Sequence, residues 1–293
     1  MQDQIKTQGT IVRANRSARL MWYFQTPKTR TCCELSQPTA FLLPINRESA
    51  MNLFSQHRDA DNIPSRAFLF HFERLRPVIE LLARKDRLLE NWYLKGGDLG
   101  EALKYRAYED DRPTKDAMNE VADRYKGKAD DAPKTIGIWN GTQVDDSGAA
   151  FSISIDGGRL LPQSFELAMD EKSHASSRLG GFRSVAEVVA KIAEIYDSFY
   201  VTFGPRRYFE KQVFDDRPGV SWMLYLPNVL TLPQVPEARD LIPVIRDGNQ
   251  QGTIVVSVTD EVFDVHNREH VKAANDIEIR LADQDLLPRF VDL

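Results

Sequence analysis

The sequence of 293 residues predicts an α+β fold, in which antiparallel strands form the sheet or sheets and the helices are segregated to one face. Helical and strand patterns occur in separate runs along the chain, without the regular β-α-β alternation of a parallel doubly wound sheet. Hydrophobic residues make up 42% of the chain and charged residues 28%, as in ordinary globular proteins. A chain of this length buries a core that needs no disulfide bonds.

The first 65 residues are predicted to be an irregular basic N-terminal arm with room for one strand. Polar and basic residues dominate this part of the chain, and its apolar runs are short. Residues 1–31 carry a net charge of +5, from Asp3 against Lys6, Arg13, Arg16, Arg19, Lys28 and Arg30. Because the whole chain has a net charge of -5, the remaining residues carry about -10.

Residues 66–293 are predicted to form the α+β domain, with a candidate sub-boundary near residues 126–134, where the chain is charged and poor in apolar residues. Apolar residues at helical spacing from Leu75 to Trp92 predict a helix of about 20 residues that packs inward. Gly96 and Gly97 are expected to end it. Asp98 and Glu101 have the spacing of a capping box, which predicts a short second helix.

Thr114 is expected to cap a third helix that ends near Tyr125. Strands follow: residues 135–140 are rich in β-formers, and three apolar residues between Phe151 and Ile155 alternate with serines at a period of two. An antiparallel meander that continues through Phe165 is the simplest arrangement of these strands.

The last third of the chain is predicted to hold two more helices and four strands. Ser184 and Glu187 match a capping box in front of an apolar helical stripe, and a final helix is predicted from Val271 to Leu281. The predicted strands cover residues 200–203, 221–226, 241–246 and 252–258.

Cysteine usage and hydropathy predict a cytoplasmic protein. The two cysteines, Cys32 and Cys33, are adjacent, which disfavours an ordinary disulfide and is typical of reduced thiols. No apolar stretch approaches the roughly 18 residues of a membrane span, and residues 20–24 are too few for a signal-peptide apolar region. We therefore expect no membrane association, and no cofactor or metal.

The acidic body of the chain disfavours nucleic acid as a direct ligand, because phosphate binding needs clustered Lys and Arg side chains. A basic protein partner is electrostatically better matched. Aromatic residues beside charged ones are typical of protein-binding hot spots. The residues expected to contact such a partner are Asp215, Asp216, Trp222, Glu278 and Asp283.

One catalytic alternative is a zinc-dependent hydrolase. His266, Glu269 and His270 match an inverted zinc motif, in which two histidines four residues apart bind the metal and the glutamate acts as base. Two features count against it. Asn267 is a natural N-cap that would place His266 outside the helix, and only 23 residues follow His270 to complete a site.

Several stretches of the chain resemble the immunity protein 52 family, whose members are the antidotes encoded beside bacterial polymorphic and type VI secretion toxins. The matching stretches are residues 92–102, 137–141 (Gly-Ile-Trp-Asn-Gly), 219–227 (Gly-Val-Ser-Trp-Met-Leu-Tyr-Leu-Pro), 235–238, 252–257 and 273–281. They span about two thirds of the chain and leave out the first 65 residues.

The resemblance implies an α+β protein without enzymatic activity that binds and neutralises a cognate toxin, most often one with a restriction-endonuclease-like nuclease domain. The sequence therefore predicts a cytoplasmic immunity protein against a DNase effector of a type VI secretion system. Inhibition by covering the nuclease active site and inhibition by blocking toxin assembly both remain open. A binding module for another basic partner differs from this prediction only in the identity of the partner.

Overall fold

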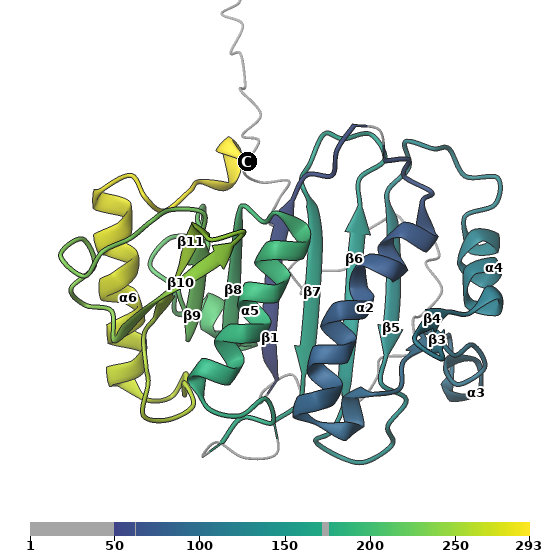
Figure 1. Ribbon diagram of the computed structural model, residues 1–293, viewed down its shortest axis with the longest axis horizontal. Helices are drawn as coiled ribbons and strands as arrows, with labels where there is room; N and C mark the ends of the chain where they lie inside the picture. Colours follow the sequence, from purple (N-terminus) through teal and green to yellow (C-terminus); the bar gives the residue numbers. More distant parts are fainter. Residues whose placement is uncertain (1–49, 62, 172–175) are drawn as a thin grey trace, which may run out of the picture. The chain divides into compact units, whose positions relative to one another are not determined.

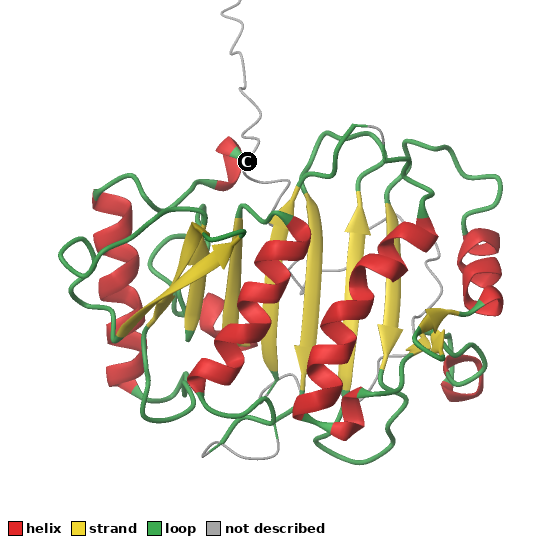
Figure 2. Ribbon diagram, viewed as in Figure 1, coloured by secondary structure: helices red, strands yellow, loops and turns green. Residues whose placement is uncertain are grey.

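A computed structural model describes residues 50–61, 63–171 and 176–293 (Figure 1). By its internal contacts the chain divides into residues 1–36 and 37–293, and all described residues belong to the second unit. Cys32, Cys33 and the basic residues of the arm lie outside the described residues. In the described part, five α-helices and a nine-stranded antiparallel sheet confirm the predicted α+β class (Figure 2).

The large sheet has the strand order β10-β11-β9-β8-β1-β7-β6-β5-β2, with antiparallel pairing throughout. Its strands are β1 (Met51–His57), β2 (Tyr93–Leu94), β5 (Lys134–Trp139), β6 (Ala149–Ile155), β7 (Gln163–Met169), β8 (Tyr200–Pro205), β9 (Met223–Leu226), β10 (Asp240–Arg246) and β11 (Asn249–Val256). A separate hairpin consists of β3 (Tyr108–Glu109) and β4 (Arg112–Pro113). The predicted meander of β5, β6 and β7 is confirmed.

Strand β1 lies in the middle of the sheet and joins its two halves. Leu53 of β1 is opposite Leu167 of β7 on one side and Phe203 of β8 on the other. The arm predicted for residues 1–65 therefore contains a strand that belongs to the sheet. The rest of that arm, residues 1–49, lies outside the described residues.

The α-helices are α2 (Phe68–Lys85), α3 (Leu99–Ala102), α4 (Lys115–Arg124), α5 (Phe182–Tyr196) and α6 (Arg268–Asp283). Short 3-10 helices are η2 (Arg87–Leu89), η3 (Arg206–Glu210) and η4 (Phe290–Asp292). Helices α2 and α5 lie side by side across one face of the sheet, and α6 lies at its β10–β11 end (Figure 1). No helix in the described part of the chain combines the length and the apolar content of a membrane span.

The main core fills the space between the sheet and the pair α2 and α5. Phe72 and Leu75 of α2 face Phe151 of β6, which is fully buried. On α5, the Tyr196 ring packs against Phe165 of β7 with ring centroids 5.0 Å apart. Each such side chain contributes roughly 1.5–3 kcal/mol on burial.

The helix starts test the capping predictions. Thr114 and Asn267 cap α4 and α6 as predicted, with their side-chain oxygens accepting hydrogen bonds from backbone N–H groups. The prediction for Ser184 was wrong, because α5 begins earlier, at Phe182, with Gly181 as its N-cap. The Ser184 hydroxyl donates instead to the carbonyl of Leu179 at 2.6 Å.

Helix α2 ends earlier than the apolar periodicity predicted. Asp86 adopts an extended conformation and accepts a hydrogen bond from the Leu88 N–H at 2.9 Å, which starts η2. Leu89 and Trp92 are nevertheless buried. The periodicity therefore identified core residues correctly and misjudged where the helix ends, because an Asp side chain competes for backbone donors.

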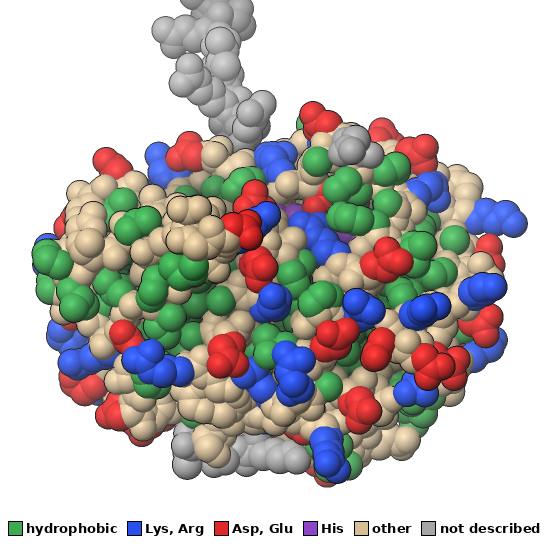
Figure 3. All heavy atoms as spheres, viewed as in Figure 1, with side chains coloured by type: hydrophobic (Ala, Val, Ile, Leu, Met, Phe, Trp, Pro, Cys, Tyr) green, Lys and Arg blue, Asp and Glu red, His purple; other side chains and the backbone are tan. Residues whose placement is uncertain are grey.

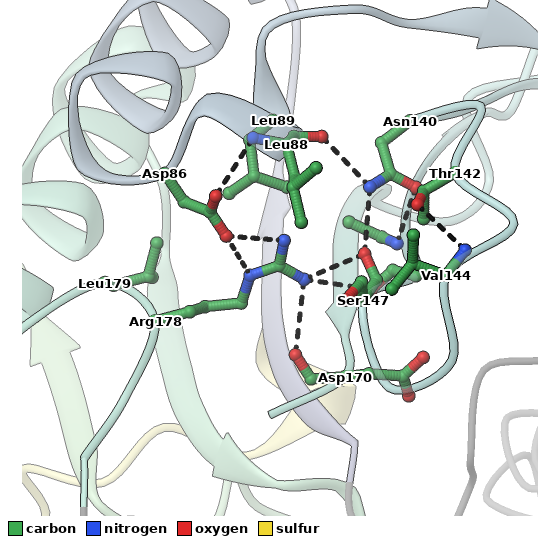
Figure 4. Close-up of polar contacts among 12 residues, drawn as sticks. Asp86, Leu88, Leu89, Asn140, Thr142, Val144, Ser147, Asp170, Arg178 and Leu179 are labelled. Atoms are coloured by element: carbon green, nitrogen blue, oxygen red, sulfur yellow. Dashed lines mark hydrogen bonds and ion pairs between the residues drawn. The ribbon is translucent and has the colours of Figure 1, made fainter. Parts of the chain in front are cut away.

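A buried arginine connects the end of α2 to the ends of two strands (Figure 4). Arg178 Nε donates to Asp86 Oδ2 at 2.8 Å, and Nη1 donates to the carbonyls of Ser147 and Asp170 at 3.1 and 3.3 Å. Its side chain is 3% exposed. The planar guanidinium suits this role because its donors point in several fixed directions.

Asn140 continues the same network. Its Nδ2 donates to the carbonyls of Leu88 and Ser147 at 3.1 and 2.9 Å, and its Oδ1 accepts from the Ala149 N–H at 3.0 Å. Asn140 follows β5 directly, so its amide closes the connection from β5 to β6 against η2 (Figure 4).

We expect Arg178→Lys to lower the free energy of unfolding by about 2–4 kcal/mol, because a single ammonium cannot serve the Asp86 carboxylate and the carbonyls together. Urea denaturation measures the change. Arg183→Lys is the matched control, since Arg183 pairs with Asp240 at the surface and should lose less than about 0.5 kcal/mol. Equal losses in both variants would contradict the role assigned to Arg178.

Two fully buried histidines lie where β1 meets α2. His57 Nε2 is 3.7 Å from Asp59 Oδ1, the same oxygen that accepts a hydrogen bond from Arg74 Nη1. The Arg74 guanidinium lies 4.2 Å from the ring centroid of Tyr196. Burial is the main cause that lowers the pKa of His57 to about 3 and that of His71 to about 4; the Arg74 cation contributes to both shifts, and the Asp59 carboxylate opposes them.

These pKa values predict loss of stability in acid. In the unfolded chain both histidines have a pKa of about 6.5, so their full contribution to the free energy of unfolding is present above that pH. This contribution is lost as the pH falls through 6.5 towards the folded pKa values, about 4 for His71 and about 3 for His57. We expect the urea concentration at the unfolding midpoint to decrease as the pH is lowered from 7 to 5. His71→Phe should reduce the slope of the unfolding free energy against pH by up to about 1.4 kcal/mol per pH unit, while Leu160→Ala, at an exposed side chain that does not titrate, should not change it. Identical slopes would refute this.

Candidate functional site

The residues predicted to contact a partner lie near the β10–β11 end of the sheet. Asp215 and Asp216 belong to residues 211–220, which run from η3 towards β9 and are called the anchored loop below. Asp283 is the last residue of α6 and is exposed. Trp222 and Glu278 are both 1% exposed.

The carboxylate of Glu278 holds the anchored loop in place. Its Oε2 accepts a hydrogen bond from the Val213 N–H at 2.7 Å, and its Oε1 accepts from the Val220 N–H at 2.8 Å. Both donors are backbone groups, one near each end of the loop. The conformation of the loop therefore depends on one buried side chain of α6.

Tyr208 adds a third donor and ties η3 to α6. Its hydroxyl oxygen lies 2.7 Å from Glu278 Oε1 and 2.8 Å from Asn275 Oδ1. The Tyr208 ring meets the Phe263 ring edge-on, with centroids 5.4 Å apart. The residues on either side of the loop are thus packed as well as hydrogen-bonded.

Burial raises the pKa of Glu278, and the hydrogen bonds from Tyr208, Val213 and Val220 oppose that shift. A buried carboxylate is tolerated only where donors replace its hydration. Burial also raises the pKa of the Tyr208 hydroxyl, and the Glu278 charge adds to that rise. Tyr208 therefore remains a neutral donor.

The outer surface of this region combines apolar and acidic side chains. Phe209 of η3 is 54% exposed and Val213 of the anchored loop is 40% exposed. Asp215 is exposed and forms no hydrogen bond or ion pair with the other described residues. Asp216 pairs with Arg289 at 3.1 Å, so part of its charge is neutralised. Exposed aromatic and acidic groups on a fixed backbone are typical of a protein-binding surface.

Two of the predicted contact residues do not reach this surface. The Trp222 indole Nε1 donates to the carbonyl of Val258 at 2.9 Å, and its ring packs near Phe203. Glu278 is enclosed by its donors. Trp222 is therefore a core residue and Glu278 supports the surface from below, because a direct contact with a partner needs an exposed side chain.

The geometry does not favour the zinc-dependent hydrolase. His266 precedes α6 and is exposed, whereas His270 is buried. His270 Nδ1 accepts a hydrogen bond from the Asp264 N–H at 2.9 Å, and Nε2 lies 2.8 Å from Glu261 Oε1. Both ring nitrogens of His270 are thus already engaged within the protein, and Glu269 is exposed in the first turn of the helix.

The face that carries α2 and α5 has a different character. Lys and Arg side chains are interspersed there with Asp and Glu side chains (Figure 3). Mixed surfaces of this kind promote solubility and do not select a charged partner. The sequence pattern does not single out Phe209 and Val213 as surface residues, because their apolar character suggests burial and only the fold exposes them.

Comparison with known proteins gives the class of this chain. Residues 71–289 match the family model of immunity protein 52. No curated protein matches the chain significantly. Among solved structures, a Pseudomonas aeruginosa T6SS protein is similar, with 13% sequence identity over 78% of this chain and 74% of that one and a TM-score of 0.44.

The family match covers most of the chain and includes α6, the anchored loop and both halves of the sheet. The chain belongs to the immunity protein 52 family. The resemblance inferred from the sequence is thereby confirmed. Strand β1 lies outside the matched residues, although it joins the two matched halves of the sheet.

We expect Glu278→Gln to destabilise the protein by about 2–4 kcal/mol, because one carboxylate oxygen becomes an NH2 group beside backbone donors. Urea denaturation measures the loss, and hydrogen exchange at Val213 and Val220 should speed up. Tyr208→Phe, which removes one donor and leaves the carboxylate, should cost only about 1 kcal/mol. Unchanged exchange at both amides in Glu278→Gln would contradict the anchoring role.

Proposed function

We propose that this immunity protein neutralises a secreted DNase of a type VI secretion system by direct binding, and that the surface around Phe209, Val213 and Asp215 contacts the toxin. Membership of the immunity protein 52 family supports the first part. The exposed apolar and acidic side chains on the anchored loop support the second. The producing cell would need the protein in its cytoplasm, where its own DNA lies.

Charge supports a nuclease as the target. A nuclease must present Lys and Arg side chains around its active site to hold DNA phosphates. The chain is acidic, with a net charge of -5, and Asp215 forms no ion pair with the other described residues. Asp216 and Asp283 extend the acidic character, although Asp216 is partly neutralised by Arg289. Complementary charge of this kind mainly raises the association rate.

The apolar side chains supply the affinity in this proposal. Phe209 is more than half exposed, and an aromatic side chain gains most when a partner removes it from water. Val213 has its backbone N–H fixed by Glu278, so it loses little conformational freedom on binding. A pre-organised loop with an aromatic anchor is suited to tight binding of one partner.

The test is co-expression with the toxin domain encoded beside this protein. We expect wild-type protein to restore growth and to co-purify with the toxin at physiological salt. Phe209→Ala should weaken the complex at least tenfold in titration calorimetry, because truncation of a hot-spot aromatic costs about 2 kcal/mol or more. Leu160→Ala, at an 84% exposed leucine in the β6–β7 turn, is the matched control and should not change affinity.

Charge reversal tests the acidic part of the surface. Asp215→Lys combined with Asp216→Lys should slow association several-fold at low salt, and the difference should shrink as salt screens the charges. Stopped-flow fluorescence measures the rates. An unchanged on-rate would remove this acidic pair from the interface, and failure of the wild type to rescue or to bind would refute the proposed function.

A further inference from the structure

An open groove of about 490 Å³ lies beside the anchored loop. Residues distant in the sequence line it: Lys211 from the loop, Val265 and His266 from the segment before α6, and Arg268, Val271, Lys272 and Asp276 from α6. The Tyr208 hydroxyl donates a hydrogen bond to Asn275, another lining residue, so a side chain of η3 directly supports the wall of the groove.

Cations dominate the charge of the groove. Lys211, Arg268 and Lys272 are exposed, and only one carboxylate, that of Asp276, lines the groove with them. Asp276 accepts a hydrogen bond from Lys272, which raises the pKa of that lysine. The groove therefore has net positive charge in a chain whose total charge is -5.

The floor of the groove is partly apolar. Val265 is 7% exposed and Val271 is half-buried, and both line the groove together with the cations. Exposed Phe209 and Val213 flank Lys211 in the sequence on either side. An occupant that fits would pair carboxylates with the rim and place an apolar side chain on the valines.

We infer that this groove binds an acidic segment of the toxin, a stretch in which Asp or Glu side chains flank an apolar residue. Charge complementarity selects the acidic groups, and the valine floor selects the apolar one. Three cations over an apolar floor form too small a basic area for stable binding of nucleic acid phosphates. The inference rests on the proposed function and specifies the toxin surface further.

The toxin surface that contacts this protein would therefore carry both positive and negative charge. Asp215 requires a basic area on the toxin, and the groove requires an acidic one beside it. Opposite charges at two separate points fix the orientation of the partner, and they repel toxins whose pattern is reversed. A groove of this kind would therefore contribute to the choice of cognate toxin as well as to affinity.

The experiment uses the full chain with Arg268→Glu and Lys272→Glu together, and three probes: the toxin domain encoded beside this protein, a labelled peptide of alternating Glu and Leu, and a short labelled DNA duplex. We expect the double reversal to weaken toxin binding at least tenfold in calorimetry and to abolish peptide binding in fluorescence anisotropy, because it replaces two attractive charges by two repulsive ones.

The matched control reverses one arginine and one lysine elsewhere, Arg84→Glu on α2 with Lys126→Glu after α4. Both are exposed, and α4 lies at the opposite end of the sheet from α6 (Figure 1). The control should bind toxin and peptide like the wild type. If the reversed groove variant does not fold by circular dichroism, Arg268→Gln with Lys272→Gln removes the charges without adding repulsion.

Each outcome decides the inference. Unchanged toxin affinity in the groove variant overturns it and leaves the proposed function intact. If the wild type binds the peptide in a groove-dependent way and does not bind the toxin, the groove has the inferred specificity and the proposed function fails. If neither probe binds, both fail. DNA binding that the reversal abolishes would identify nucleic acid as the occupant and overturn the inference.

Discussion

The position of β1 is the constraint on which the rest of the structure depends. Its seven residues pair with β7 along one edge, and six of them pair with β8 along the other. The strand thus joins a half built from β2, β5, β6 and β7 to a half built from β8 to β11. Helices α2 and α5, which cover the two halves, can then pack against each other (Figure 1). Long-range pairing of this kind costs loop-closure entropy before it contributes any stability.

Buried polar groups then determine where the backbone is rigid. Arg178 ties the end of α2 to the strand ends on one side of the molecule, and Glu278 ties the anchored loop to α6 on the other. Neither side chain contacts solvent appreciably, so each pays a desolvation cost that only its full set of hydrogen bonds offsets. These hydrogen bonds fix the conformation of the anchored loop, so the loop would lose little conformational entropy on binding.

In the proposed function, that rigidity would help the anchored loop to bind a toxin. A toxin must be recognised quickly and held tightly, and these demands fall on different groups. In the proposed interface, exposed acidic side chains such as Asp215 would act at long range and speed the encounter, whereas Phe209 and Val213 would act only on contact. The nearby groove, lined by Lys211, Arg268 and Lys272, adds positive charge beside these acidic side chains. A surface with both signs and an apolar centre discriminates between partners better than a uniformly acidic one.

The sequence by itself determined the fold class, most strands, the caps of α4 and α6 and the family, because these follow from local periodicity, from short side-chain-to-backbone contacts and from characteristic stretches such as Gly219 to Pro227. It did not determine the partner of β1, the early end of α2 at Asp86, or the start of α5. Nor did it separate the exposed Asp215 from the buried Trp222 and Glu278. The exposure of a side chain depends on how the folded chain packs. A glutamate is usually found at the surface, but the packing of α6, η3 and the anchored loop places three donors around Glu278 and excludes water from it.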